Sequence, residues 1–454
     1  MSEVQAKRVN KDRISALPDE VLYHILSFLK TEDVVMTIFL SRRWKNIWAS
    51  VPSLDFCDQE NPDTIPFSRF IDNVLFFRDS TDIHKFRLHS ISVEDFDRIC
   101  GWIGAAIRRN VVELDLSVKY YGGDEDHQQI FKLPKSVFTC KTLRVLKLWS
   151  NFIINAPESG CFPNLKSLCV HFDLPVNNSM EKLFSCCPVL EDLSIHGNHG
   201  FYGLNFTVSA PELKTLKVEW MTHGDYERCN FYVVAPKLEN FHLWQYPSTD
   251  CFLENAKSLV RVTISLQDHF ADEDRLFAIR GTALLAVISN VRYLSLSAHC
   301  LKGCCLPVFD KLSRLELALY SCYYWELLKE LLRRSPKLEY LVLELKDFIC
   351  STAPSSHQWS PPESIPICLL THLKTVSIRG FKGKLDEMDV AKYLLNNGEV
   401  LKKMTFYSED LLRTKEELKM ELSMCHWGSK TCQVEFFPDQ KDEGLSFLGM
   451  RSWV

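Results

Sequence analysis

The sequence predicts an α/β protein in which a small N-terminal helical domain is followed by a solenoid of stacked, strand-containing repeats and a distinct C-terminal segment. Three observations lead to this prediction. Apolar residues follow a helical period over the first fifty residues, a short apolar pattern recurs thirteen times from residue 83 onward, and a Ser- and Pro-rich stretch interrupts the recurrence near its end. The 454 residues are 46% hydrophobic and 24% charged, which is typical of a globular chain.

Charge and composition narrow the class of protein further. The net charge of −5 is small for this length, so we expect neither a nucleic-acid partner nor binding to a membrane surface. No stretch approaches 18 uncharged apolar residues, and the first 20 residues lack the apolar core of a signal peptide. The 17 cysteines are too few for a disulfide scaffold. We therefore expect free thiols in an intracellular, cytoplasmic and/or nuclear protein that is not secreted.

Three short helices are expected at the N-terminus, after twelve polar residues. Pro18 suits a first helical turn, where its missing N–H is not needed. Thr31 and Ser41 are expected to cap the second and third helices. Forty residues bury too little surface for a strong core of their own, so we expect a partner to cover part of the apolar surface. The first helix carries an apolar stripe at Val21, Leu22, Ile25, Leu26 and Leu29.

The recurring unit has an apolar residue, a second one three positions later and a third two positions after that. Leu143, Leu146 and Leu148 form a clean copy. On a strand the second and third positions face the same way and the residue between them faces outward, so stacked units bury a continuous core. The mean spacing of about 26.5 residues fits leucine-rich repeats, which form a horseshoe-shaped solenoid. The units start at residues 83, 111, 143, 165, 190, 213, 238, 259, 291, 312, 338, 373 and 401.

The segments between the units are expected to contain helices. Helical spacing is present in Met180–Cys187 and in Leu327–Leu332. Proline precedes several strands and is expected to stop a helix before each of them, because it lacks an N–H and constrains the preceding residue. Loops are expected at 120–129 and, rich in Ser and Pro, at 351–366. The prolines in question are Pro188, Pro211, Pro236 and Pro336.

Both ends of the chain resemble a known plant family. The run Asp12–Leu22, continued by Ile25–Leu29, Leu40–Trp44 and Ile47-Trp48, resembles a plant-type F-box, with departures at Met36 and Ile38-Phe39. The segments His372–Ile378, Gly380–Gly383, Tyr393–Leu395, Val400–Met404 and Cys432–Val434 resemble an FBD domain. The organisation implied is a flexible N-terminus at 1–12, an F-box at 13–53, leucine-rich repeats at 83–350, a linker at 351–366, an FBD domain at 367–437 and a tail at 438–454.

The resemblance implies a non-catalytic substrate receptor of a Skp–cullin–F-box type ubiquitin ligase. The F-box would bind a Skp-type adaptor and, through it, a cullin–RING ligase, while the repeats would capture an unknown protein substrate. Two alternatives stay open. Some of the adaptor-binding residues could belong only to the internal core, and the chain could be a non-degradative interaction scaffold. The adaptor-binding residues implied are Leu17, Pro18, Val21, Leu22, Ile25, Leu26, Leu29, Trp44 and Trp48.

The outward positions of the repeat strands are candidates for target binding. Such positions line one face of a leucine-rich array, and exposed aromatic residues are frequent binding anchors. The alternative is a solvated face whose aromatic residues have no binding role. The candidate residues are Lys147, Trp149, His171, His196, Lys217, Glu219, His242 and Trp244.

Motifs for catalysis are absent from the sequence. It contains no Cys-x-x-Cys, no Gly-x-Gly and no Gly-x-Ser-x-Gly. Two clusters, Cys186-Cys187 with His196 and His199, and His299-Cys300 with Cys304-Cys305, lack the ligand spacing of a zinc site. We therefore expect no metal, no cofactor and no catalytic residue.

Overall fold

The computed structural model forms two compact units, Met1–Asp192 and Leu193–Val454, called here the N-terminal and C-terminal units. None of the helices in the described part of the chain has the length and hydropathy that a bilayer span requires. The described residues are 13–58, 66–79, 81–90, 96–118, 131–149, 152–153, 161–172, 183–184, 186–198, 205–221, 229–245, 249–266, 275–298, 304–320, 324–346, 359–408 and 411–438.

The N-terminal unit begins with short helices around one small apolar core. Its members are Leu22, Leu26, Val34, Trp44, Ile47 and Val51. Thr31 does not cap the second helix, because it lies inside that helix and its hydroxyl accepts the backbone N–H of Asp55 at 2.7 Å. Ser41 lies three residues before the third helix and does not cap it. The helices are α1 (Asp19–Leu26), α2 (Thr31–Met36), the 3-10 helix η1 (Thr37–Phe39), α3 (Trp44–Ile47) and the 3-10 helix η2 (Trp48–Ser50).

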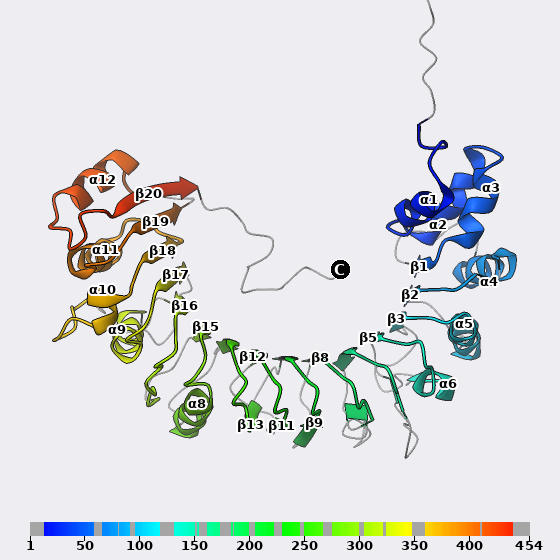
Figure 1. Ribbon diagram of the computed structural model, residues 1–454, viewed down its shortest axis with the longest axis horizontal. Coiled ribbons are helices and arrows are strands. Elements are labelled where there is room, and N and C mark those ends of the chain that lie inside the picture. The colour runs from blue at the N-terminus through cyan, green and yellow to red at the C-terminus, as the bar shows by residue number, and fades with distance from the viewer. Residues whose placement is uncertain are drawn as a thin grey trace, which may run out of the picture. The chain divides into compact units, whose positions relative to one another are not determined.

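The helices lead directly into a parallel sheet, and longer helices cover one face of it (Figure 1). The strand order in this unit is β1-β2-β3-β5-β7. The strands are β1 (Ser53–Cys57), β2 (Lys85–Ser90), β3 (Glu113–Val118), β5 (Val145–Trp149) and β7 (Ser167–Phe172), with a separate pair formed by β4 (Phe131–Lys132) and β6 (Phe152–Ile153). The covering helices are α4 (Phe67–Phe77), α5 (Phe96–Arg108) and α6 (Lys135–Phe138).

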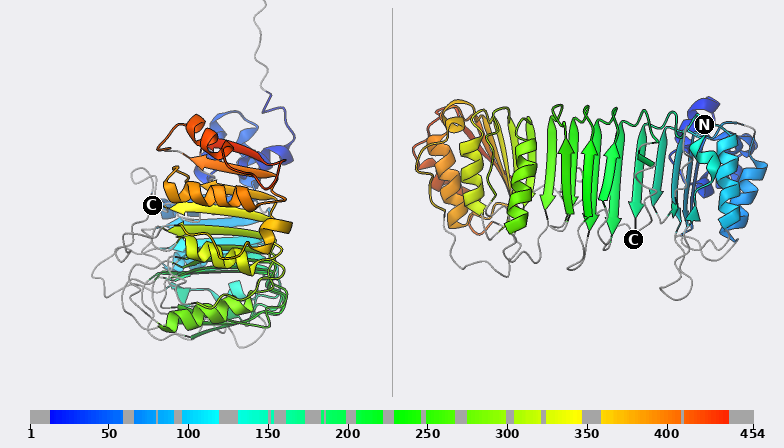
Figure 2. Two further views of the ribbon diagram at one scale, coloured as in Figure 1. Left: turned by 90° about the vertical axis from the view of Figure 1, so that its left-hand side faces the viewer. Right: turned by 90° about the horizontal axis from the view of Figure 1, so that it is seen from below.

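The C-terminal unit also contains a parallel sheet, and Figure 2 shows its strands side by side. The strands of its main sheet, in spatial order, are β8 (Asp192–Asn198), β10 (Thr215–Met221), β12 (Asn240–Gln245), β14 (Arg261–Leu266), β15 (Tyr293–Ala298), β16 (Arg314–Tyr320), β17 (Tyr340–Lys346), β18 (Thr375–Arg379), β19 (Lys403–Ser408) and β20 (Gln433–Pro438). Its helices are α8 (Arg275–Val287), α9 (Tyr324–Arg334), α10 (Ile367–Thr371), α11 (Leu385–Asn397) and α12 (Lys415–Ser423).

All thirteen predicted repeats are confirmed by burial. Each side chain at their three apolar positions is at most 7% exposed. The pairing of β10 with β12 also agrees with the predicted pattern. Leu216 lies opposite Phe241 and Val218 opposite Leu243, while Lys217 between them is exposed. Stacked rows of such side chains bury a continuous apolar core in each unit. The α/β class, with N-terminal helices followed by a parallel repeat sheet, is therefore correct.

A second, three-stranded parallel sheet replaces the helices expected before two strands. It contains β9 (Asn205–Ser209), β11 (Cys229–Val234) and β13 (Thr249–Glu254), in the order β13-β11-β9. Pro211 and Pro236 thus follow strands, and the prediction that they stop helices is wrong. Pro336, by contrast, follows α9, which lies where the sequence predicts a helix.

Aromatic side chains fill the space between this second sheet and the main sheet. Phe206 and Phe231 stack with ring centroids 5.1 Å apart, and Trp220 meets Phe231 edge to face at 5.5 Å. Trp220 is fully buried, and Gly197 on β8 lies against its indole. A Cβ atom at position 197 would come within 2.3 Å of that ring, so this position requires glycine.

The C-terminal segment extends the repeat sheet with β18, β19 and β20. The carboxylate of Glu387 on α11 accepts backbone N–H groups of Lys382, Gly383 and Lys384 at 2.8, 2.9 and 3.2 Å, which fixes the turn before that helix. Trp359, from the Ser- and Pro-rich stretch, packs edge to face against Trp325 at 5.9 Å. The expected loop at 120–129 and residues 351–358 lie outside the described residues.

Candidate functional site

The N-terminal helices divide the predicted adaptor-binding residues into two groups. Leu22, Leu26 and Trp44 are 0%, 3% and 4% exposed and pack in the domain's own core. This burial favours the alternative that these three residues belong to the internal core and stabilise the helices. Their assignment to the adaptor surface stays a prediction.

The remaining residues leave an apolar surface open to solvent. Val21, Ile25 and Phe28 follow one another at intervals of four and three residues, and Ile25 and Phe28 are 43% and 76% exposed. Pro18 and Leu29 are also exposed, whereas Leu17 and Trp48 are half-buried. Phe28 was absent from the predicted set, although its helical spacing from Ile25 indicates it. Further exposed apolar side chains in this part of the chain are Ile14, Met36, Phe39 and Leu40.

Arg43 and Trp44 hold the segment before α1 in place. The Arg43 guanidinium donates to the carbonyl of Leu17 at 2.6 Å, and also to the Ser15 carbonyl and the Asp19 carboxylate. The Trp44 indole N–H donates to the Ser15 hydroxyl at 2.8 Å. These contacts fix Pro18 beside the exposed face of α1. Residue type and spacing gave no signal for this role of Arg43, because a basic residue in a short helix is usually only solvated.

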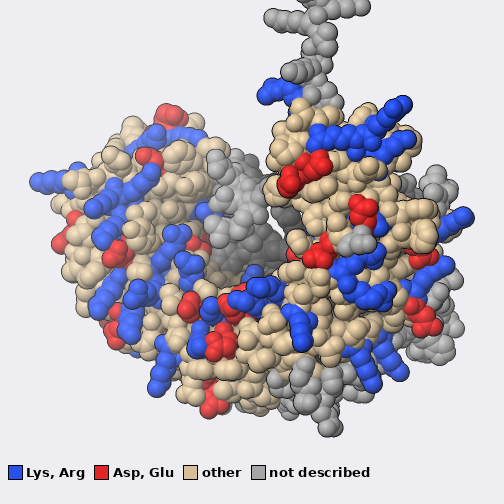
Figure 3. Space-filling view, turned by 45° about the vertical axis from the view of Figure 1, so that its right-hand side comes forward, with Lys and Arg blue, Asp and Glu red and all other residues tan. Residues whose placement is uncertain are grey.

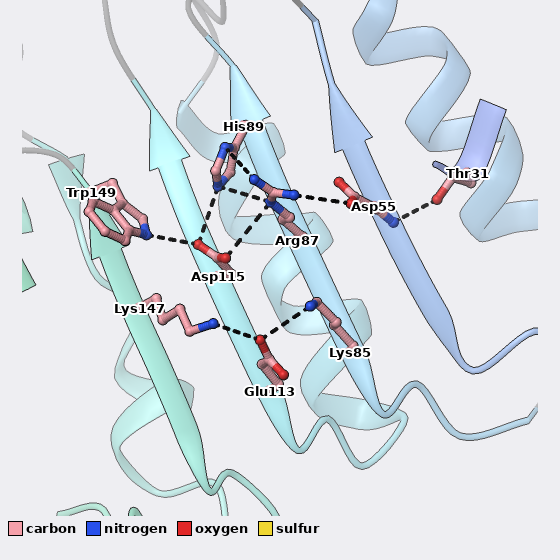
Figure 4. Close-up of polar contacts among 9 residues, drawn as sticks. All are labelled: Thr31, Asp55, Lys85, Arg87, His89, Glu113, Asp115, Lys147 and Trp149. Carbon is pink, nitrogen blue, oxygen red and sulfur yellow. Dashed lines mark hydrogen bonds and ion pairs between the residues drawn. The ribbon is translucent and has the colours of Figure 1, made fainter. Parts of the chain in front are cut away.

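A polar network covers the outward face of the first strands in the N-terminal unit (Figure 4). Its centre is Asp115, which accepts the indole N–H of Trp149 at 3.1 Å and lies 3.2 Å from the Nε2 atom of His89. Arg87 lies between Asp55, at 3.3 Å, and Asp115, at 3.8 Å. The network fixes the predicted target residue Trp149 in one orientation.

Two further ion pairs extend this network toward the beginning of the strands. Glu113 binds the ammonium groups of Lys147 at 3.0 Å and of Lys85 at 3.4 Å. Lys147 and Trp149, both predicted to bind the target, are thus held by carboxylates of the neighbouring strand. His171 lies beside Trp149, with ring centroids 6.1 Å apart.

The pKa of Asp115 reflects these contacts. Burial by itself raises the pKa, but the hydrogen bond with His89 and the charges of His89, Lys147 and Arg87 outweigh it and hold the pKa below its ordinary value of 3.8. A carboxyl group with a lowered folded-state pKa stabilises the fold above its unfolded-state pKa. That stabilisation is lost as the pH falls through the folded-state pKa.

We expect Asp115→Asn to destabilise the protein at pH 7 by roughly 1–3 kcal/mol, because it removes a buried charge that several donors satisfy. The difference between the two proteins should shrink below about pH 4, where the wild-type carboxyl group begins to lose its advantage. Denaturant unfolding of both proteins at pH 7, 5 and 3 measures this difference. A difference that does not depend on pH would show that Asp115 contributes only through its shape.

In the C-terminal unit, one carboxylate lies between two imidazoles. Glu219 on β10 is 2.9 Å from the Nδ1 atom of His196 on β8 and 4.0 Å from the Nε2 atom of His242 on β12. Lys217, the fourth polar residue of this group, is exposed. Trp244 lies opposite Glu219 on the next strand and is half-buried. The structure therefore brings five of the eight predicted target residues onto three neighbouring strands.

The charges in this group shift two pKa values. Burial alone raises the pKa of Glu219, but His196, with smaller contributions from His242 and Lys217, holds it below the ordinary value. Burial also lowers the pKa of His242, and this effect exceeds the opposing attraction of Glu219. The group therefore favours an ionised Glu219 and a neutral His242 at pH 7.

The cysteines next to the repeat strands are poor nucleophiles. Burial, followed by the neighbouring Cys186, raises the pKa of Cys161 to about 11, and burial raises the pKa of Cys187 further. A thiol reacts as its thiolate, so a raised pKa lowers its reactivity. Within the described ranges, no group of three His, Cys, Asp or Glu residues is arranged to hold a metal ion. His199, His299 and Cys300 lie outside those ranges.

Models of three protein families match parts of this chain. The F-box domain model matches residues 14–56, and the FBD model matches residues 361–406. The model of the leucine-rich repeats of FBD-associated F-box protein At5g56370 matches residues 99–266. The N-terminal helices are thus an F-box, and the chain is an F-box protein with leucine-rich repeats.

Three similar proteins of Arabidopsis thaliana match along nearly their whole length. F-box/FBD/LRR-repeat protein At3g26920 is 32% identical, with 94% of this chain and 96% of the relative covered. At5g56420 and At2g04230, which carry the same description, are each 31% identical, with 94% of this chain and 99% and 97% of the relatives covered. The chain belongs to this plant F-box/FBD/LRR-repeat family.

Proposed function

We propose that the protein is the substrate-recognition subunit of a Skp–cullin–F-box type ubiquitin ligase. The observation that carries the proposal is the exposed apolar face formed by Val21, Ile25 and Phe28 on a domain whose own core is already complete. Monomeric proteins rarely expose such a contiguous apolar surface unless a partner covers it. Because this domain matches the F-box model, we infer that the partner is a Skp-type adaptor.

In this proposal the two parts of the chain have different roles. The F-box binds the adaptor, and through it the cullin–RING ligase, while the outward strand positions of the repeats bind a protein to be ubiquitinated. The chain contributes no catalytic group, since ubiquitin transfer belongs to other subunits. In this proposal the protein acts in the cytoplasm or nucleus. The alternative, a scaffold without a ligase, needs the repeats but has no use for an exposed F-box face.

The test is loss of adaptor binding in Ile25→Lys. This change places an ammonium group on the proposed contact surface, where burial without a partner is costly, so we expect adaptor co-purification to fall at least tenfold. Asn46→Lys adds the same charge at an exposed polar position of α3 and should leave co-purification unchanged. Adaptor binding is measured with both proteins at equal concentration after a thermal melt has confirmed that each is folded.

Leu26→Lys is unsuitable for this test, because Leu26 is buried and the change would unfold the F-box itself. Equal adaptor binding by the wild type, Ile25→Lys and Asn46→Lys would remove the main support for the ligase subunit and favour the scaffold.

A further inference from the structure

A row of alternating arginine and tyrosine residues crosses four neighbouring strands of the C-terminal unit. Arg261 on β14 lies opposite Tyr293 on β15, Tyr293 opposite Arg314 on β16, and Arg314 opposite Tyr340 on β17. All four alternate with buried core positions such as Val262, so they face outward. Arg261, Arg314 and Tyr340 are exposed, and Tyr293 is half-buried between the two arginines. We call these four residues the Arg–Tyr row.

Tyr293 fixes the two arginines of the row. Their guanidinium carbons lie 6.0 Å (Arg261) and 5.9 Å (Arg314) from the centre of its ring, within the range of cation–π contacts. The phenol donates to Glu316 at 2.6 Å, which prevents the ring from turning away. Burial, together with this hydrogen bond, raises the pKa of Tyr293, so its hydroxyl stays protonated. The row is therefore built before any ligand binds.

One of the two arginines of the row has no carboxylate partner among the described residues. Glu316 is buried and accepts hydrogen bonds from Tyr293 and from Arg314, whose Nη2 atom lies 2.8 Å away. Arg261, among the residues that the structure describes, has the Tyr293 ring as its partner and no carboxylate. Within the described part of this surface, two guanidinium groups thus share one carboxylate, which makes the surface complementary to added negative charge.

We propose that the Arg–Tyr row binds an acidic segment of the target protein, with carboxylates three residues apart. Neighbouring strands lie about 4.8 Å apart, so Arg261 and Arg314, two strands apart, are separated by about 9.6 Å. In an extended polyproline II peptide, residues i and i+3 lie on the same side at about 9.3 Å. Carboxylates at those positions can pair with the two arginines, and the two residues between them pass over Tyr293.

Several features favour a peptide over a nucleic acid. The chain is acidic overall, and Lys, Arg, Asp and Glu are interspersed over the face displayed in Figure 3. The Glu316 carboxylate also lies beside the row, where it would repel a continuous chain of phosphates more strongly than two separate carboxylates. The inference deepens the proposed function, because it names the chemistry of the target. Peptide binding is tested without the adaptor, so the proposed peptide site and the proposed ligase function can each fail independently.

The experiment measures fluorescence anisotropy of a labelled ten-residue peptide bound to the full chain. One peptide carries Asp at positions 4 and 7 in a Pro- and Ser-rich background, and its control carries Asn at both positions. We expect only the Asp peptide to bind, with an affinity that falls as salt is raised from 50 to 500 mM. Moving the second Asp to position 6 should weaken binding, because the two carboxylates then face different directions.

Arg261→Gln should weaken binding of the Asp peptide about tenfold, the scale of one charge-assisted hydrogen bond. Lys257→Gln removes the same charge from an exposed loop before β14 and should have no effect. Arg261 forms no ion pair within the described chain, and the variant loses only an exposed cation–π contact, so it should melt close to the wild-type temperature. Equal binding of the Asp and Asn peptides, or equal losses in both variants, would overturn the proposal. So would tighter binding of a single-stranded oligonucleotide than of the peptide.

Discussion

Leu216→Asp should unfold the repeats around β10, whereas Lys217→Asp should leave them folded. Leu216 is fully buried between the rows of neighbouring repeats, and a carboxylate there would have no partner. We expect a loss of at least ~4 kcal/mol in the free energy of unfolding, which is at the upper end for single substitutions. Lys217 is exposed on the outward face, so its replacement should cost less than ~1 kcal/mol.

Thermal and denaturant unfolding of both variants measure the difference. Lys217→Asp also brings a carboxylate toward Glu219, so a small loss is expected even with an intact fold. Similar losses in the two variants would mean that the register of the strand is not the one described.

Gly197→Ala should destabilise the C-terminal unit by about 3 kcal/mol, because the added methyl group would overlap the buried Trp220 ring. The indole packs against both Phe206 and Phe231 and cannot move aside without displacing them. Gly101→Ala in α5 is the matched control. Its Cβ would meet no atom within 4 Å, and alanine favours a helix, so we expect this variant to gain about 0.5–1 kcal/mol.

A double-mutant cycle identifies the cause of the loss. Gly197→Ala combined with Trp220→Phe should be less destabilised than the sum of the two single changes, because the smaller ring makes room for the methyl group. Strict additivity would indicate that the cost lies in the backbone of β8 instead.

The repeat core could be predicted from the sequence because burial on one side of a strand places apolar residues two positions apart. Thirteen triplets such as Leu143, Leu146 and Leu148 place two apolar residues on one side of a strand, and no other arrangement buries both. A fourteenth triplet, Val51, Leu54 and Phe56, is buried in the same way and lies outside the thirteen predicted units. Its first residue lies just after the 3-10 helix η2, which ends at Ser50, and its second and third residues lie in β1, so the triplet falls where the helical pattern passes into the first strand.

Other features depend on contacts that no local pattern encodes. Leu22 and Ile25 look alike in an apolar stripe, yet only the packing of α1 against α3 decides that Leu22 is buried and Ile25 exposed. The second sheet uses short strands such as β9, whose residues carry too weak a signal to distinguish them from a loop. The Arg–Tyr row required the register of four strands far apart in the sequence, so it could be found only in the structure.

The hydrogen bond between Thr31 and the backbone of Asp55 ties the F-box to the integrity of the repeats. β1 is the outermost strand of its sheet, and an outermost strand with unsatisfied amides can pair with another molecule and start aggregation. The F-box helix α2 occupies that place and satisfies the Asp55 amide. A truncated protein that begins at β1 would therefore self-associate, and its loss of function could not be attributed to the missing adaptor contact alone. In this chain the helical domain that carries the proposed adaptor-binding surface therefore also covers the first edge strand of the repeat sheet.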